Sequence, residues 1–152
     1  MASRRKGRIL AFQALYSWDV HNGEARNPQL PQGLLDFSWT EESPPIDPNS
    51  QREALDEDIL AFSRLLVTGT VENIKAVDEM IQKHLVNWEI KRLNRVDLAL
   101  IRMSTYTLMF QLDMPPSIVI DEAVDISKEF GTDDSYRFVN GVLDNIRKTV
   151  SQ

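Results

Sequence analysis

FGTDDSYRFVNGVLDNIRKTV, residues 130–150, is the stretch that decides the fold. It predicts a helix that begins near Ser135 and turns one face toward a core. The apolar residues that recur at helical spacing on this face are Val139, Val142, Leu143, Ile146 and Val150. At about 100° per residue, Phe138 lies roughly 100° from the middle of that face, on the same helix as Arg137 and close to Asp134. Phe138 is therefore either a stacking surface beside charged groups or a boundary residue that packs beneath a loop.

The segment before this helix predicts two more helices. Ten of the fifteen residues at 96–110 are apolar and would cover almost the whole circumference of a helix, which is typical of a buried one. Two prolines end it, and residues 117–130 form a further amphipathic helix that Gly131 closes. We expect the helix at 96–110 to be the spine of the C-terminal half, wrapped by the others.

Two short motifs resemble β-structure. Residues 118–120, IVI, resemble a strand, and Asn140-Gly141 resembles a hairpin turn. Each lies inside a longer helical period, and no second alternating segment is present to pair with, so we predict no sheet. Gly141 inside a helix costs about 1 kcal/mol relative to alanine, which favours a role in close helix packing or in the approach of a ligand.

The N-terminal half predicts three helices and one long loop. Apolar spacing indicates helices at 3–20, 52–66 and 68–85. Gly69 lies near the start of the last of them.

The loop is predicted from its prolines. Five of the seven prolines lie in residues 22–52, which breaks any regular pattern except one short helix around 34–37. Phe37 and Trp39 are expected to hold this loop against the body of the protein.

The composition is that of a soluble globular protein. The chain has 152 residues, of which 42% are hydrophobic and 26% charged, enough for one well-buried domain. The absence of cysteine excludes disulfides, thiolate metal sites and cysteine nucleophiles, and fits a reducing cytoplasm. No apolar run approaches the roughly 20 residues that a membrane span needs, so we expect a cytoplasmic protein without a membrane segment. His21 and His84 lack metal-ligand or triad spacing and are expected to be structural or surface residues.

Charge is distributed unevenly along the chain. The net charge is −6, yet four of the 17 basic residues lie in the first eight positions and form what we call the basic arm: Arg4, Arg5, Lys6 and Arg8. Residues 41–58 are strongly acidic by contrast. A basic arm on an acidic body would bind phosphate in one place and repel it elsewhere, giving orientation as well as affinity. The alternative is a solvated, frayed terminus.

Motifs for catalysis are absent from the sequence. It has no Gly-rich phosphate loop, nucleophile elbow, metal-ligand cluster or dinucleotide fingerprint. An all-helical chain of this size with a basic arm and exposed aromatic residues suggests binding. We expect no enzymatic activity and no cofactor.

Three segments resemble the NusB family of bacterial transcription antitermination factors. They are RRKGRILAFQALYSW at 4–18, RVDLALIRMSTYTLMF at 95–110 and PPSIVIDEAVDISKEFGTDDSYRFVNGVLDNI at 115–146. The last is the most specific, because its succession of prolines, an acidic helix, a glycine stop and FVNGVLD is hard to obtain by chance. Together they cover somewhat under half of the chain, and residues 22–52 carry no weight.

The resemblance implies an all-α fold of about seven helices in two small packed bundles, without a sheet. The single domain would span 1–152, with an N-terminal bundle at about 3–86 and a C-terminal bundle at about 87–150. The resemblance implies no enzymatic activity. It also implies pairing with NusE, a small-subunit ribosomal protein, and binding of the pair to single-stranded boxA RNA, especially in ribosomal RNA operons. NusA, NusG and RNA polymerase would complete a complex that suppresses termination.

The resemblance also assigns roles to single residues. The basic arm would contact RNA phosphates, although Lys6 keeps the charge of an arginine without its bidentate geometry. Asp134, Arg137 and Phe138 fall on RNA-side positions, where base stacking on Phe138 would contribute roughly 1–3 kcal/mol. The resemblance also places Tyr16 on the side that faces RNA. It places Asp97, Lys91 and Arg92 on the side that faces NusE.

Two other functions are compatible with the sequence. Cytosine-5 RNA methyltransferases can carry an RNA-binding domain that resembles this family, although this chain has no methyl-donor-binding region and no cysteine. The other is a helical adaptor that binds protein only, against which the basic arm argues. The family includes forms that self-associate, and the sequence leaves monomer and homodimer open.

Overall fold

The computed structural model describes residues 2–22, 57–86 and 89–150. These residues form six α-helices and one short 3-10 helix and contain no strand, which confirms the predicted all-α class. The elements in chain order are α1 (Ala2–Asn22), α2 (Glu57–Glu72), α3 (Ile74–Lys83), η3 (Ile90–Arg92), α4 (Arg95–Phe110), α5 (Pro116–Phe130) and α6 (Ser135–Val150). Residues 23–56 lie outside the described residues, together with the predicted helix at 34–37, Phe37, Trp39 and the side chain of His21.

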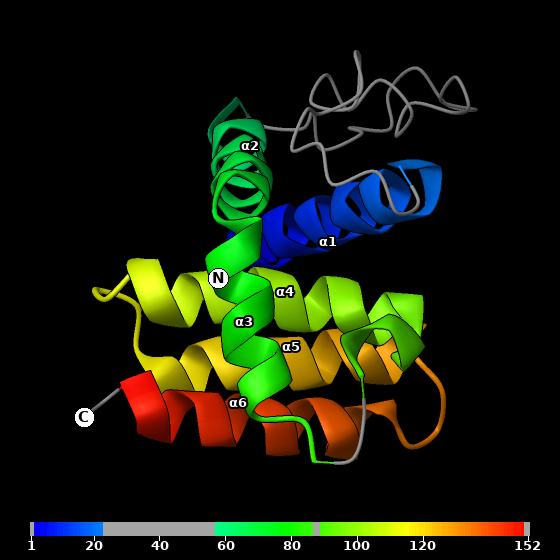
Figure 1. Cartoon of the computed structure of the whole chain (residues 1–152). Coiled ribbons are helices and arrows are strands. Elements are labelled where there is room, and N and C mark those ends of the chain that lie inside the picture. Colours follow the sequence, from blue (N-terminus) through cyan, green and yellow to red (C-terminus); the bar gives the residue numbers. More distant parts are fainter. Residues whose placement is uncertain (1, 23–56, 87–88, 151–152) are drawn as a thin grey trace.

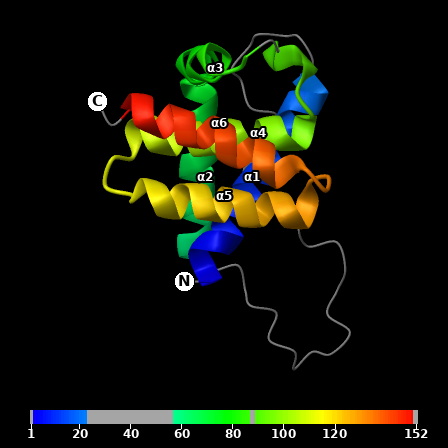
Figure 2. The same ribbon diagram turned by 90° about the horizontal axis from the view of Figure 1, so that it is seen from below.

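α4 is the central helix of the fold. Its residues from Asp97 to Leu108 are all buried, as expected for a helix that is apolar around its circumference. The other five α-helices each pack against it, so α4 is the spine of the whole fold rather than of the C-terminal half alone. Figure 1 shows α4, α5 and α6 side by side, with α3 crossing in front of them and α1 and α2 above. Figure 2, seen from below, shows α5 and α6 nearest the viewer and α1 and α2 beyond α4.

Local sequence sets the ends of these helices. Asn94 caps α4, because its side-chain oxygen accepts a hydrogen bond of 2.8 Å from the Val96 N–H. Pro116 occupies the first turn of α5, where the missing N–H costs no helical hydrogen bond. Gly131 ends α5 as predicted, and its N–H donates to the Ser127 carbonyl at 2.8 Å. Its backbone is extended, and an added Cβ would lie 2.7 Å from that carbonyl oxygen, so close approach makes the glycine necessary.

The boundary between α2 and α3 lies later than the sequence spacing predicts. The spacing indicates helices at 52–66 and 68–85, whereas α2 continues through Gly69. A Cβ at Gly69 would lie 2.2 Å from the Tyr106 side chain, so this glycine serves the contact between α2 and α4 and does not start a helix. The turn comes at Asn73, whose side-chain amide donates to the Gly69 carbonyl at 2.8 Å.

A network of ion pairs joins three helices. Arg102 of α4 donates two hydrogen bonds of 2.9 Å to the Asp78 carboxylate of α3 and lies 3.5 Å from the Asp19 carboxylate of α1. Asp19 also accepts hydrogen bonds of 2.8 and 2.9 Å from Arg95. The Arg102 guanidinium lies 5.7 Å from the ring centroid of Trp18. Because Arg102 and Asp19 are both buried, this network fixes α1 and α3 on α4.

His84 has a structural role, as expected. Its Nδ1 lies 2.8 Å from the Met80 carbonyl oxygen, and its Nε2 lies 2.7 Å from the Thr149 hydroxyl of α6. This contact ties the end of α3 to α6. α3 thus packs on helices of the expected C-terminal bundle, and the division of the chain near residue 86 stays a prediction.

Candidate nucleic-acid interface

The basic arm begins α1 and lies over α5. Arg4 is exposed and Lys6 is half-buried. Arg5 forms ion pairs with Glu129 at 3.2 Å and with Asp125 at 3.7 Å, both on α5. A phosphate that binds Arg5 must therefore replace these carboxylates.

Arg8 faces inward, which corrects the prediction of a phosphate contact at this position. Its side chain forms an ion pair with Glu122 of α5 and lies 5.4 Å from the ring centroid of Phe62 of α2. The residue is only 3% exposed. Burial, and to a smaller extent the charge of Arg4, lowers the pKa of Arg8 to about 10. Arg8 therefore joins α1, α2 and α5.

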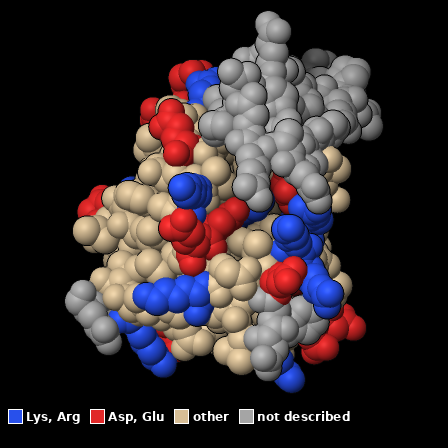
Figure 3. Space-filling view, in the orientation of Figure 1, with Lys and Arg blue, Asp and Glu red and all other residues tan. Residues whose placement is uncertain are grey.

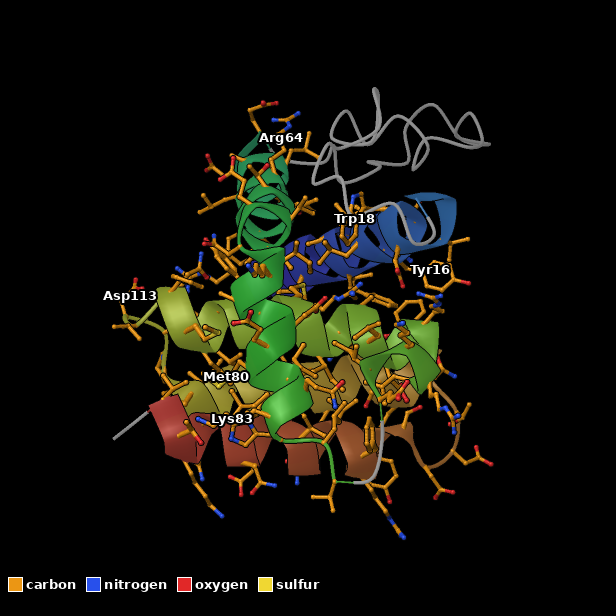
Figure 4. All side chains as sticks on the ribbon, viewed as in Figure 1. Tyr16, Trp18, Arg64, Met80, Lys83 and Asp113 are labelled. Carbon is orange, nitrogen blue, oxygen red and sulfur yellow. The ribbon has the colours of Figure 1, made fainter. Side chains whose placement is uncertain are left out.

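The other predicted residues gather at the far end of α1, where α4 and α6 begin and α5 ends (Figure 1). The Phe12 ring of α1 meets the Phe130 ring of α5, with centroids 5.4 Å apart. Tyr16 follows Phe12 by one helical turn on the same face and is 40% exposed. Figure 4 shows Tyr16 at this end of the molecule. We call this region the helix-end surface, formed by Tyr16, Lys91, Arg92, Asp134, Arg137 and Phe138.

The α5–α6 turn (residues 131–134) and the first turn of α6 that follows it carry three of these residues. Asp134 and Arg137 are exposed. Phe138 is partly buried and packs against the hydrophobic core, whereas a role in base stacking stays a prediction. Gly141, one turn further on, is exposed and has nothing within 4 Å of the position of a Cβ. The prediction that Gly141 allows close helix packing is therefore wrong, whereas there is space for a ligand to approach it.

The residues predicted on the partner side differ in exposure. Lys91 and Arg92 are exposed on η3, and Figure 3 shows Lys and Arg side chains gathered along this edge of the molecule. Asp97 is only 7% exposed, which corrects the prediction of a direct partner contact. Burial raises the pKa of the Asp97 carboxyl, and a hydrogen bond from Ser135 offsets part of that rise. Asp97 therefore holds the first turns of α4 and α6 together.

Two residues that the sequence analysis did not single out, Lys128 of α5 and Tyr136 of α6, lie on either side of the α5–α6 turn. The Lys128 Nζ lies 5.2 Å from the ring centroid of Tyr136, and the Arg137 guanidinium carbon lies 5.6 Å from it. The Arg137 Nε donates a hydrogen bond of 3.0 Å to the Tyr136 hydroxyl. The contact between Lys128 of α5 and Tyr136 of α6 joins two helices across the turn between them, so no helical period reveals it. The only signal in the sequence is the adjacency of Tyr136 and Arg137.

The chemistry available at the helix-end surface is that of cations beside aromatic rings. Across the described ranges, no group of three or more His, Cys, Asp or Glu side chains is placed to hold a metal ion. None of the helices in those ranges is long and apolar enough to cross a membrane. Cations bind phosphates and exposed rings stack on bases, so the arrangement suits a nucleic acid.

Comparison with known protein families matches residues 5–148 to the NusB family. The chain belongs to the NusB family. The transcription antitermination protein NusB of Treponema denticola is 50% identical to it over 144 residues, which cover 95% of each chain. NusB of Treponema pallidum (strain Nichols) is 48% identical over 146 residues, covering 96% of this chain and 93% of the relative.

Solved NusB structures share the fold of this NusB-family chain. T. maritima NusB matches with a TM-score of 0.75 and 32% identity, covering 95% of this chain and 90% of the other. A chain in the crystal structure of the antitermination factors NusB and NusE in complex with dsRNA matches with a TM-score of 0.76 and 28% identity. That match covers 98% of both chains. The predicted NusB-like fold is confirmed.

Proposed function

We propose that this chain is a transcription antitermination factor that pairs with NusE and binds boxA RNA, especially in transcripts of ribosomal RNA operons. NusA, NusG and RNA polymerase are its further proposed partners, and the cytoplasm is its proposed location. The proposed action is binding, in which catalytic residues and a cofactor take no part. A homodimer that covers the helix-end surface would act as an inactive store of the protein.

The observation that carries the proposal is similarity in both sequence and fold along almost the whole chain. The Treponema relatives are named transcription antitermination proteins. The structural neighbour with NusE was solved with RNA bound to that complex. The surface that this chain offers is compatible with the same partners.

The helix-end surface supplies the proposed contacts with RNA bases. Tyr16 and the open part of Phe138 offer rings for stacking, and a stacked base contributes roughly 1–3 kcal/mol. Asp134 accepts hydrogen bonds from a base edge, and Arg137 binds phosphate. Lys91 and Arg92, on the same end of the molecule, face NusE in this proposal.

The basic arm supplies phosphate contacts through Arg4, Arg5 and Lys6. Arg5 exchanges its ion pairs with Asp125 and Glu129 for RNA phosphate. Both carboxylates and Arg5 itself are well exposed to water, and an exposed ion pair contributes only about 0–1 kcal/mol. Binding of phosphate also releases counterions from the RNA, so the exchange is favourable at low salt.

The test is RNA binding by the full chain, measured with and without NusE. Single-stranded boxA RNA, a scrambled strand and a duplex of equal length serve as ligands, because the related complex contains dsRNA. We expect boxA to bind most tightly, and more tightly with NusE. Across a series of salt concentrations, Arg5→Ala should reduce the slope of log affinity against log salt by about 0.7, the value for one phosphate contact on a single strand.

Arg64→Ala is the matched control for loss of an ion-paired surface arginine. Arg64 lies on α2, 3.3 Å from Glu57, and should leave the salt slope unchanged; Figure 4 shows it far from the helix-end surface. Equal and weak binding to boxA and scrambled RNA, with and without NusE, would refute the proposed function. An unchanged salt slope for Arg5→Ala would show that the basic arm takes no part in RNA binding.

A further inference from the structure

Beside the α5–α6 turn, two cations from the adjoining helices lie against one aromatic ring. Lys128, near the end of α5, and Arg137, in the first turn of α6, both lie within 6 Å of the Tyr136 ring centroid, at 5.2 and 5.6 Å. Lys128 and Arg137 are exposed, whereas Tyr136 is half-buried. The ring therefore serves as a common support for two positive charges that belong to different helices.

The Tyr136 hydroxyl orients one of these cations. It accepts the hydrogen bond of 3.0 Å from the Arg137 Nε. This hydrogen bond, with the negative charge of Asp134 as a smaller cause, raises the pKa of Arg137. With Nε engaged in this bond, the two terminal nitrogens of the guanidinium are the donors that can bind a phosphate through two hydrogen bonds.

These cations differ from those of the basic arm in their ion pairing. Arg5 is paired with carboxylates of α5, and Arg8 is paired with Glu122. Neither Lys128 nor Arg137 forms an ion pair within the part of the chain that the structure describes. A phosphate that reaches this turn therefore meets positive charge without displacing a carboxylate from that part of the chain.

We infer that Tyr136 is a positioning residue that holds Lys128 and Arg137 as a two-cation clamp for adjacent RNA phosphates. The inference rests on the proposed function and adds two residues to it. Lys128 contacts phosphate directly, and Tyr136 acts through Arg137. The clamp stands beside Phe138, so it fixes the RNA backbone where the neighbouring base stacks.

The first experiment measures the salt dependence of RNA binding for Lys128→Gln in the full chain paired with NusE. Loss of one phosphate contact should reduce the slope by about 0.7. Lys83→Gln is the matched control, because Lys83 is an exposed lysine at the end of α3 and lies toward the C-terminal half of α6 (Figure 4). Equal slopes for the Lys128→Gln and Lys83→Gln variants would overturn the clamp.

The second experiment is a double-mutant cycle between Tyr136 and Arg137. Tyr136→Phe keeps the ring and removes the acceptor of the Arg137 Nε, so we expect RNA affinity to fall several-fold with unchanged thermal unfolding. In an Arg137→Ala background the same substitution should have no further effect on affinity. An effect of equal size in both backgrounds would show that Tyr136 does not act through Arg137.

The two proposals fail in distinguishable ways. If the wild-type chain with NusE does not bind boxA RNA, both the proposed function and the clamp are wrong. If the wild type binds and Arg5→Ala reduces the slope, while Lys128→Gln and Tyr136→Phe change nothing, the clamp alone is wrong.

Discussion

At the scale of the residue, Asp97 shows how burial changes the role of a charged side chain. A carboxylate in the first turn of a helix is favoured by about 0.3–1 kcal/mol. Asp97 lies in the first turn of α4, yet it is 7% exposed and its Oδ1 has no hydrogen-bond partner among the described residues. Burial outweighs the helix dipole and the hydrogen bond from Ser135, and the pKa of Asp97 rises from its ordinary 3.8.

This shift predicts a pH dependence of stability. Because the pKa is higher in the folded state than in the unfolded state, the folded protein binds more protons between the two values. The contribution of Asp97 is therefore fully present below 3.8 and is lost as pH rises through the raised pKa. Relative to Asp97→Asn, the wild type should gain stability as pH falls from neutrality toward 3.8.

Thermal unfolding of both proteins across this pH range measures the effect. Asp133→Asn, which removes an exposed carboxylate from the nearby turn, is the matched control and should follow the wild type. A constant difference between the wild type and Asp97→Asn at all pH values would contradict the shift.

At the scale of the element, two helical glycines with the same intrinsic cost have opposite surroundings. Gly69 lies in α2 against Tyr106, which is buried between α2 and α4. Gly141 lies in α6, where a Cβ would meet nothing within 4 Å. Helix propensity alone favours alanine by about 1 kcal/mol at both positions.

The two alanine substitutions should therefore change stability in opposite directions. Gly69→Ala should lower the free energy of unfolding by about 1–3 kcal/mol, because the Tyr106 ring must move out of a packed core. Gly141→Ala should raise it by up to about 1 kcal/mol. Chemical denaturation measures both changes, and destabilisation by Gly141→Ala would contradict the open surroundings. If Gly141 admits the RNA backbone, the same variant should bind boxA RNA more weakly while unfolding at higher temperature.

These glycines also show where periodicity stops being informative. The helical spacing of apolar residues predicts α1, α4, α5 and α6 closely, because the apolar residues that face the core recur along each helix in the local sequence. The position at which α2 ends cannot be predicted from its local sequence alone. Gly69 is typical of a helix boundary in sequence, and only the position of Tyr106 on another helix explains why α2 continues past it.

The same limit applies to the candidate site. A wheel of α1 places Arg8 in line with Ala11 and Leu15, both fully buried, so its inward direction was visible in the spacing. The Glu122 partner that makes this burial possible lies on α5 and was not visible. The cluster of Lys128, Tyr136 and Arg137 likewise depends on how the α5–α6 turn folds back.

At the scale of the whole molecule, the proposed RNA surface is divided between α1 and the α5–α6 turn. Its shape depends on what holds α1 against the other helices. Two buried arginines hold α1 at opposite ends. Near its start, Arg8 of α1 pairs with Glu122 of α5, and near its end, Asp19 of α1 pairs with Arg102 of α4. Each arginine side chain reaches across a helix interface to a carboxylate on the other helix.

The network around Arg102 should therefore control the stability of the entire fold. Arg102→Leu leaves the partly buried Asp78 without its partner and removes one cation from the buried Asp19, and breaking a buried pair costs about 3–5 kcal/mol. Denaturant unfolding should show a loss of this size in one cooperative transition, because Arg102 links three helices that pack on one core. Arg64→Gln removes the exposed ion pair with Glu57 and should cost less than about 1 kcal/mol. Similar small losses for both variants would show that apolar packing alone fixes α1 on α4, and the RNA surface would then owe its shape to the core rather than to the buried charges.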